Sequence, residues 1–142
     1  MIRRALIVLF VGIALSSCTQ NDGYIGLLFG KWQLIEIWED ETMTQHDNLY
    51  YNFQTSVIMV QVVYRDGIEN AAGLYYGNYE RDGDELRFKI VEPSSDNSDM
   101  PSVLRLKKGE ENMFHIEKLT SSKMILTRDK DGHFEKFVFR KF

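Results

Sequence analysis

The sequence predicts an all-β domain in which about eight antiparallel strands close into an up-and-down barrel. Runs rich in Val, Ile, Tyr and Phe, which suit a pleated sheet, recur at short intervals from residue 31 to residue 141. Asp-Gly pairs at 66–67, 82–83 and 131–132 supply residues that tolerate the positive φ of tight hairpin turns. Short turns join antiparallel neighbours, and a sheet of this size loses its exposed edges when it closes. At 142 residues the chain has the length of one domain.

The strands follow from these runs and from the alternation of apolar and polar residues. Leu86, Phe88 and Ile90 share one face of their segment, and Phe114 and Ile116 share one face of another, as in strands with one dry and one wet side. Strands are expected at residues 31–39, 48–54, 57–65, 72–81, 85–92, 112–119, 123–128 and 133–141.

The third of these segments, SVIMVQVVY, is apolar on both faces apart from one glutamine. Either it is buried on both sides, or its outer face is covered by the N-terminal tether or by a partner.

One connection is long enough to hold a helix. Residues 92–112 begin as a polar, Pro-containing loop, after which Ser98 or Asp99 is a candidate N-cap and Pro101 stands in the first turn. Gly109 is a candidate terminator. A helix of about two turns is therefore predicted at 99–108.

The N-terminus has the pattern of a secretion leader. Arg3 and Arg4 precede an apolar stretch at 5–15, which is shorter than the about 20 residues that a membrane-spanning helix needs. The sequence LSSC at 15–18 follows, and it resembles the lipobox of bacterial lipoproteins. The alternative is an ordinary secreted leader with a chance cysteine.

The lipoprotein resemblance implies three parts: a signal peptide at 1–17, a tether at 18–27 and a barrel domain at 28–142. It also implies cleavage before Cys18 and modification of Cys18 by fatty acids such as palmitate, which would anchor the chain firmly because more than one acyl chain is attached. Thr19 after the cysteine favours the outer membrane of a Gram-negative bacterium. Asp22 is the only acid close by, which favours a domain facing the periplasm.

Charge and cysteine content exclude other classes. The formal net charge is −4, and removal of residues 1–17 takes away two arginines and no acid, which makes it −6. Basic residues form no stripe or block along the chain, so no nucleic-acid partner is expected. Cys18 is the only cysteine, and the mature domain therefore has no disulfide.

The first strand opens with Gly30-Lys31-Trp32, and this motif resembles the Gly-x-Trp that opens the first strand of lipocalins. The resemblance implies that Trp32 plugs the closed end of the barrel and that an arginine of the last strand stacks on it, with Arg140 as the first candidate and Arg128 as the second. Gly30 would let the chain turn close beneath the barrel.

More closely, residues 28–142 resemble the small lipocalin-like lipoproteins of Gram-negative bacteria. The segments that carry the resemblance are GKW, YYNFQ, GNYERDGDEL and FHIEKLTSSKMIL, together with the ending FRKF. The second and third signature motifs of animal lipocalins are absent, which argues against a carrier of hormones or pigments. The resemblance implies an envelope barrel, usually without a known activity.

Aromatic side chains are spread over adjacent strands and give two readings. They either fill the barrel with a solid core or line a pocket for a small hydrophobic ligand. Trp38 is counted among them because it lies six residues after Trp32 and is therefore expected on the same face. The candidate pocket residues are Trp38, Tyr51, Phe53, Tyr64, Tyr75, Tyr79, Phe88 and Phe114.

No motif for catalysis, a metal or a cofactor is visible. His46, His115 and His133 lack ligand-like spacing, and residues 129–135 suit a hairpin turn better than a calcium loop. Two functions follow from the sequence. The first is a membrane-anchored barrel that binds a small hydrophobic ligand, and the alternative is an interaction or structural lipoprotein with a filled barrel. The sequence does not predict the oligomeric state.

Overall fold

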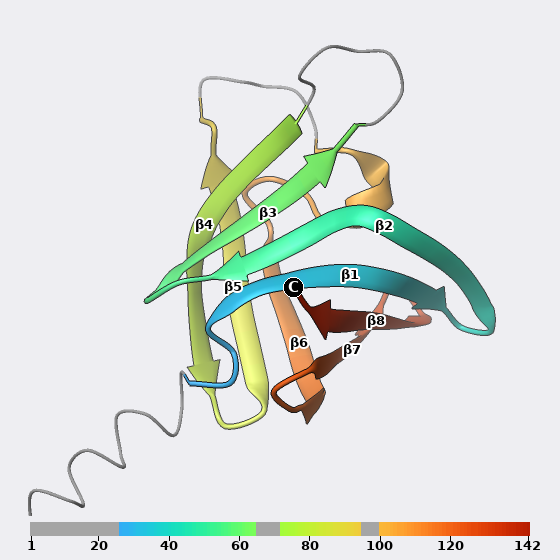
Figure 1. The fold of residues 1–142 in the computed structure, drawn as a ribbon. Coiled ribbons are helices and arrows are strands. Elements are labelled where there is room, and N and C mark those ends of the chain that lie inside the picture. The colour runs from blue at the N-terminus through green and yellow to red at the C-terminus, as the bar shows by residue number, and fades with distance from the viewer. Residues whose placement is uncertain (1–25, 65–71, 95–99) are drawn as a thin grey trace, which may run out of the picture.

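A computed structural model of the chain describes residues 26–64, 72–94 and 100–142. Its strands form a closed antiparallel barrel in simple sequence order, each paired with the next and the last paired with the first (Figure 1). The predicted all-β, up-and-down barrel of eight strands is confirmed. The strands are β1 (Gly30–Glu39), β2 (Thr42–Phe53), β3 (Val57–Val63), β4 (Ala72–Asp82), β5 (Glu85–Glu92), β6 (Glu111–Leu119), β7 (Lys123–Lys130) and β8 (His133–Lys141).

The strand bounds agree with the sequence prediction to within two residues, except at the start of β2. That strand begins at Thr42 and not at residue 48. Its first half, TMTQHD, is largely polar and exposed and shows no apolar alternation, so neither periodicity nor composition marks it as a strand.

The two ends of the barrel differ. We call the end with the β2–β3, β4–β5 and β6–β7 turns the floor, and both the start of β1 and the end of β8 also lie there. The opposite end, with the β1–β2 and β7–β8 turns and the β5–β6 connection, is the mouth.

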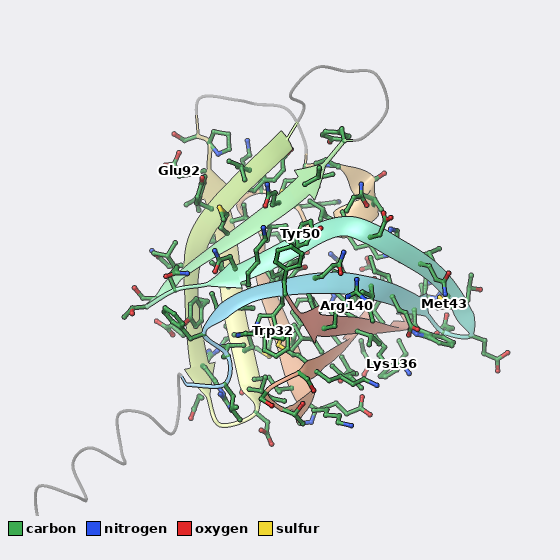
Figure 2. All side chains as sticks on the ribbon, in the orientation of Figure 1. Trp32, Met43, Tyr50, Glu92, Lys136 and Arg140 are labelled. Atoms are coloured by element: carbon green, nitrogen blue, oxygen red, sulfur yellow. The ribbon has the colours of Figure 1, made fainter. Side chains whose placement is uncertain are left out.

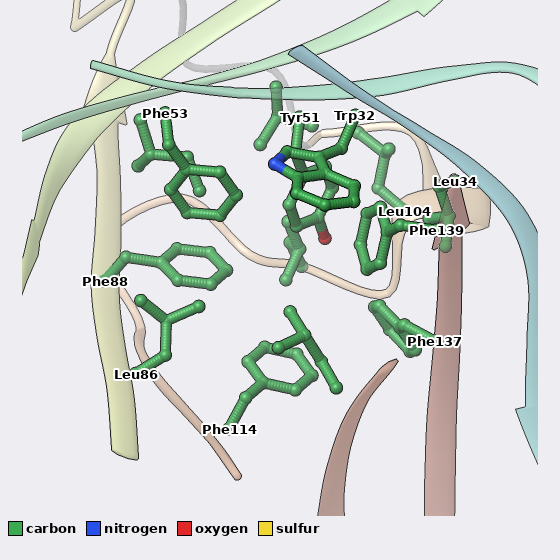
Figure 3. Packing of buried hydrophobic residues seen from close by; sticks show 14 of the residues in the cluster. Trp32, Leu34, Tyr51, Phe53, Leu86, Phe88, Leu104, Phe114, Phe137 and Phe139 are labelled. Carbon is green, nitrogen blue, oxygen red and sulfur yellow. The ribbon is translucent and has the colours of Figure 1, made fainter. Parts of the chain in front are cut away.

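The interior between floor and mouth is packed with aromatic rings (Figure 3). Tyr51 contacts Phe139 with ring centroids 4.9 Å apart, and Phe88 stacks on Phe114 at 5.7 Å. Phe114 in turn contacts Phe137 at 5.2 Å. These separations lie in the range of favourable aromatic pairs, so the rings form one continuous core.

A β-bulge in β1 reverses the orientation of its second half. Leu34 pairs with Phe139 on β8, and Glu36 pairs with Val138, so Ile35 is an extra residue in β1. One extra residue exchanges the inward and outward faces of the strand beyond it. Ile37 and Glu39 therefore follow Trp32 and Leu34 on the inner side.

The bulge shows that the sequence prediction for Trp38 was wrong. Trp38 lies on the outer face, opposite Lys136, whose Nζ is 4.7 Å from the centre of the indole ring. Its Nε1 donates a hydrogen bond to Glu36 Oε2 at 3.1 Å. The period-2 argument failed because a bulge leaves no clear mark in the sequence.

The predicted helix at 99–108 is also wrong. Only one 3₁₀ turn, Ser102–Leu104, is present, and residue 99 lies outside the described residues. Arg105 ends the turn in the left-handed region with φ 55°. Leu104 and Leu106 are both buried in the core. An α-helix would place them about 200° apart, so burial of both excludes it.

The predicted signal peptide and all but the last two residues of the predicted tether lie outside the described residues. No helix in the described part of the chain has the length and apolar character needed to cross a membrane.

Candidate functional site

Trp32 closes the floor of the barrel. Its side chain is fully buried, and its Nε1 donates a hydrogen bond to the Leu28 carbonyl at 2.9 Å. Lys141 Nζ lies 4.5 Å from the centre of the ring and donates to the Phe29 carbonyl. A Cβ on Gly30, which has φ +113°, would come within 2.7 Å of the same ammonium group. Glycine is therefore needed where the chain turns beneath the barrel.

The cation on this ring is not the predicted one. Arg140 pairs in register with Gln33 and not with Trp32, and its Nε donates to Gln33 Oε1 at 2.6 Å on the outer face. Lys141 is the residue of β8 opposite Trp32. Arg128, the second candidate, lies over Phe114 instead. The prediction failed by one residue because adjacent strand residues face opposite sides.

Most of the predicted pocket residues pack against one another. Tyr51, Phe53, Phe88 and Phe114 are at most 2% exposed and belong to the continuous ring cluster, with Tyr79 at its edge. Phe53 meets the Tyr79 ring edge-on at 5.2 Å. The rings therefore fill the lower and middle barrel, which agrees with the solid-core reading of the sequence.

Two other candidates lie elsewhere. Tyr75 is partly buried and packs against the core from β4, whereas Tyr64 lies just beyond the end of β3 and is 42% exposed. Together with the outward Trp38, the exposed Tyr64 shows that the eight candidates do not surround one site.

A cavity of about 340 Å³ lies at the mouth, among residues that were not candidates. Its lining combines two apolar side chains of the β5–β6 connection with charged side chains from β1, β7, β8 and that same connection. The lining residues are Glu39, Met100, Ser102, Arg105, Leu106, Lys107, Lys130, Asp131, His133 and Glu135.

Two arginines and two glutamates form an ion-pair network beside this cavity. Glu135 is 4% exposed and accepts hydrogen bonds from Arg128 Nε at 2.8 Å and from Arg105 Nη1 at 3.2 Å. Arg105 Nη1 also donates to Glu39 Oε2 at 2.7 Å. Partial burial opposes the charged form of Arg105, but the bonds and charges of Glu39 and Glu135 raise its pKa overall.

Arg128 joins the network to the aromatic core. Its guanidinium lies 4.4 Å from the centre of the Phe114 ring, within the range of a cation–π contact. It also donates to Asn112 Oδ1 at 3.0 Å and to the Arg105 carbonyl at 2.7 Å. The second bond holds the left-handed residue of the connection in place, so the connection is fixed at the mouth by buried polar contacts.

One buried hydroxyl remains unsatisfied. Among the described residues, the Tyr51 hydroxyl has no hydrogen-bond partner, and its oxygen lies in the middle of the ring cluster (red in Figure 3). Burial raises the pKa of Tyr51; the positive charge of Arg128 acts against this shift and the negative charge of Glu135 adds to it. The hydroxyl is therefore neutral and a free donor below the network.

His133 forms a pair with Asp40 at the rim of the mouth. Its Nδ1 lies 2.7 Å from Asp40 Oδ2, and the Asp40 Oδ1 accepts from the Phe134 backbone at 3.0 Å. The hydrogen bond and the charge of Asp40 raise the pKa of His133. The pair connects the β1–β2 turn with the β7–β8 turn. The described residues contain no group of three or more His, Cys, Asp or Glu side chains placed to hold a metal ion.

The sequence contains a signal for this network, although no short motif marks it. Arg128 continues the inward row of Met124 and Leu126, and Glu135 precedes Phe137 and Phe139 in the inward row of the next strand. An arginine and a glutamate in the apolar rows of one hairpin indicate a buried ion pair, and the two residues are directly paired. Arg105 and Glu39 carried no comparable signal.

A family model described as a lipocalin-like domain matches residues 13–142. A lipocalin-like protein from Bacteroides uniformis is similar in structure, with 28% sequence identity, a TM-score of 0.66, and coverage of 81% of this chain and 98% of that one. An uncharacterized protein from Bacteroides eggerthii shares 27% identity with a TM-score of 0.61 and coverage of 80% and 98%. No curated protein sequence matches the chain.

Proposed function

Because the chain belongs to the family of lipocalin-like domains, we propose that it is a lipid-anchored envelope barrel that binds a small amphipathic molecule at its mouth. The observation that carries this proposal is the mouth cavity of about 340 Å³, a size typical of the smaller ligand sites in proteins. The mode of binding differs from a deep apolar pocket, since aromatic rings fill the lower barrel.

The lining fits a molecule with an apolar body and a polar end. Met100 and Leu106 present apolar surface, while Arg105 and Lys107 offer donors and Glu39 offers acceptors. Ligand sites commonly combine apolar walls with a few polar groups that fix orientation. No catalytic role is part of this proposal.

A binding assay tests the site. The neutral fluorescent probe N-phenyl-1-naphthylamine is titrated into the purified protein, and molecules that co-purify with the protein are identified by mass spectrometry. Ser102→Trp should weaken probe binding by about tenfold or more, because an exposed lining side chain is replaced by one that fills the cavity.

Val103→Trp is the matched control. Val103 is the next residue in the same 3₁₀ turn, is 37% exposed and does not line the cavity, so its variant should bind as the wild type does. Equal effects of the two variants would contradict the proposed site. Absence of both probe binding and a co-purified molecule would contradict ligand binding altogether.

Anchoring rests on the sequence LSSC at 15–18 after its apolar stretch. In cells fed an alkyne-labelled palmitate, the chain should become labelled, and Cys18→Ala should abolish the label and leave the precursor uncleaved. Equal labelling of the variant would overturn anchoring at Cys18. Fractionation then tests the proposed location, an outer-membrane anchor with the barrel facing the periplasm.

One observation favours the second function, an interaction lipoprotein. Val57, Leu74 and Tyr76 on the outer face of β3 and β4 are each 38% exposed, and Met59 pairs with Tyr76 between them. Contiguous apolar side chains on an outer face are a feature of interaction sites. A photo-crosslinking residue at 76 in intact cells should capture a protein under this alternative and none under the ligand-binding proposal.

A further inference from the structure

Folding gathers basic side chains on one outer face of the barrel. Lys31 of β1, Arg140 and Lys136 of β8 and Lys123 of β7 all point outward, and Arg140 is directly opposite Lys123. Figure 2 shows Arg140 and Lys136 on the same side of the barrel as Tyr50. We call these four basic residues, with Tyr50 and Phe142, the basic face. It lies on a chain whose overall charge is negative.

Among residues 26–64, 72–94 and 100–142, no acid neutralises the charges of the basic face. In the described part of the chain, none of its four basic side chains forms an ion pair with an acid. Lys31 Nζ instead lies over two rings, 4.5 Å from the centre of Tyr50 and 4.7 Å from that of Phe142. Arg140 donates to the neutral Gln33 amide. This leaves a cationic surface that is free to attract anions.

Exposed aromatic rings lie at the edge of the basic face, where the start of β1 meets the end of β8. Phe142 is 68% exposed and Phe29 is 44% exposed, and the Phe142 backbone N–H donates to the Lys31 carbonyl at 3.0 Å. Exposed rings beside lysine and arginine form the combination that settles at a membrane interface, where the ring meets the headgroup region and the cation meets phosphate.

The tether reaches the barrel beside this face. Cys18 precedes the first described residue, Gly26, by eight residues, a span of at most about 28 Å when fully extended. The segment then passes Phe29, whose carbonyl accepts a hydrogen bond from Lys141 at the end of β8. A lipid on Cys18 would therefore hold the basic face within a few nanometres of the bilayer.

We propose that the basic face docks on an anionic lipid surface, so that the barrel lies on its β1–β8–β7 side against the membrane that anchors it. This inference rests on the proposed acylation of Cys18. Docking would add the electrostatic attraction between the basic side chains and anionic headgroups to the hold of the anchor. Because the anchor already holds the barrel at the bilayer, the effective concentration of lipid near the basic face is high, and a weak attraction is enough for docking.

The acylated chain in vesicles provides the test. Because Cys18 is the only cysteine and is occupied by lipid, a second, introduced cysteine can carry a nitrobenzoxadiazole label without competition. Ser122→Cys places the label next to Lys123 at the basic face. Asn78→Cys places it on β4, across the barrel and opposite Val57 on the outer apolar face. Quenching by lipids with a nitroxide headgroup then reports which side touches the membrane.

On vesicles of phosphatidylethanolamine and phosphatidylglycerol, the label at residue 122 should be quenched at least about twice as strongly as the label at 78. High salt should remove the difference in quenching between the two labels because it screens the attraction between the basic face and the lipid headgroups. Lys123→Glu and Arg140→Glu should each remove it as well because they reverse a charge in that face. Lys89→Glu, on the opposite wall, is the matched control and should preserve it. On pure phosphatidylcholine the two labels should be quenched equally.

Flotation of the protein with the vesicles separates the two proposals. A chain that does not float is not anchored, which overturns the proposed acylation. A chain that floats and shows equal quenching at both positions, or stronger quenching at 78, is anchored but does not dock by the basic face. A preference for residue 122 that persists in high salt and in both charge-reversed variants would also overturn electrostatic docking.

Discussion

Replacement of Trp32 by alanine should remove a large part of the free energy of unfolding. The indole is fully buried, and a tryptophan side chain removes roughly 150–250 Å² from water, which corresponds to about 4–6 kcal/mol at 25 cal/mol/Å². Substitutions of buried tryptophan by alanine cost about 3–5 kcal/mol. The lost hydrogen bond to the Leu28 carbonyl adds about 1 kcal/mol. We expect a total loss of about 4–6 kcal/mol, against about 5–15 for a domain of this size.

Trp38→Ala is the matched comparison on the same strand. Trp38 lies on the outer face, where it contacts Lys136 and donates to Glu36, so its loss should cost only about 0.5–1 kcal/mol. The sequence predicted that the two tryptophans share one face of the strand, with Trp38 in the interior near the mouth. The outward position of Trp38 reverses that expectation.

Urea unfolding followed by circular dichroism gives both values. With an m-value of about 1.5 kcal/mol/M, a loss of 4 kcal/mol lowers the midpoint by roughly 2–3 M, whereas Trp38→Ala should lower it by less than about 1 M. Acrylamide quenching of the single remaining tryptophan should be weak for Trp32 and strong for Trp38. If Trp38→Ala were the more destabilising substitution, both the floor plug and the orientation set by the bulge would be refuted.

Three further changes follow from other features. A Cβ on Gly77 would stand 1.8 Å from a backbone carbonyl of β5, so Gly77→Ala should lower the free energy of unfolding in urea by about 3 kcal/mol or more. Near Gly73 only the end of an aromatic side chain would have to move, so Gly73→Ala should lower it clearly less. Glu135→Leu leaves the buried guanidinium of Arg128 without its carboxylate partner and should lower the free energy of unfolding by about 3–5 kcal/mol. A loss below about 1 kcal/mol would contradict the ion-pair network. The pKa of His133 is raised above 6.5 and that of Asp40 is lowered below 3.8, so the pair should stabilise the fold most between these values. Its contribution should fade as the pH rises through the folded pKa of His133 or falls through that of Asp40. NMR titration should find a lower His133 pKa in Asp40→Asn than in the wild type, and an unchanged pKa would refute the pairing.

The strands could be predicted because most of them alternate regularly around one dry interior. In β5 the buried Leu86, Phe88 and Ile90 alternate with Arg87 and Lys89, and the predicted bounds of that strand were correct. The exceptions have a common physical cause. The start of β2, the bulge at Ile35 and the connection that contains Arg105 are held by tertiary contacts and not by local periodicity.

The candidate site was predicted less well because it is assembled from distant parts of the chain. Glu39, Arg105 and Glu135 meet at the mouth although up to 96 residues separate them, and none belongs to a short motif. The basic face was missed for the same reason, since Lys31 and Lys123 lie far apart in sequence and only barrel closure brings their strands onto one side. Tyr51, Phe53, Tyr79, Phe88 and Phe114 do lie in the interior, whereas Trp38 and Tyr64 do not. Rings that fill a barrel and rings that line a pocket give the same sequence pattern.

The extra residue at Ile35 has a consequence for how this barrel can diversify. Deletion of Ile35 would let Glu36 follow Leu34 directly in regular pairing with β8, so Ile37 and Glu39 would stay inward and Trp38 would stay outward. The first strand could therefore lose one residue at this point while the side chains at the mouth kept their orientation. To exchange the carboxylate of Glu39 for the indole of Trp38 at the opening, the second half of β1 would instead have to slip by one residue along β8, with Ile35 taken into the regular pairing.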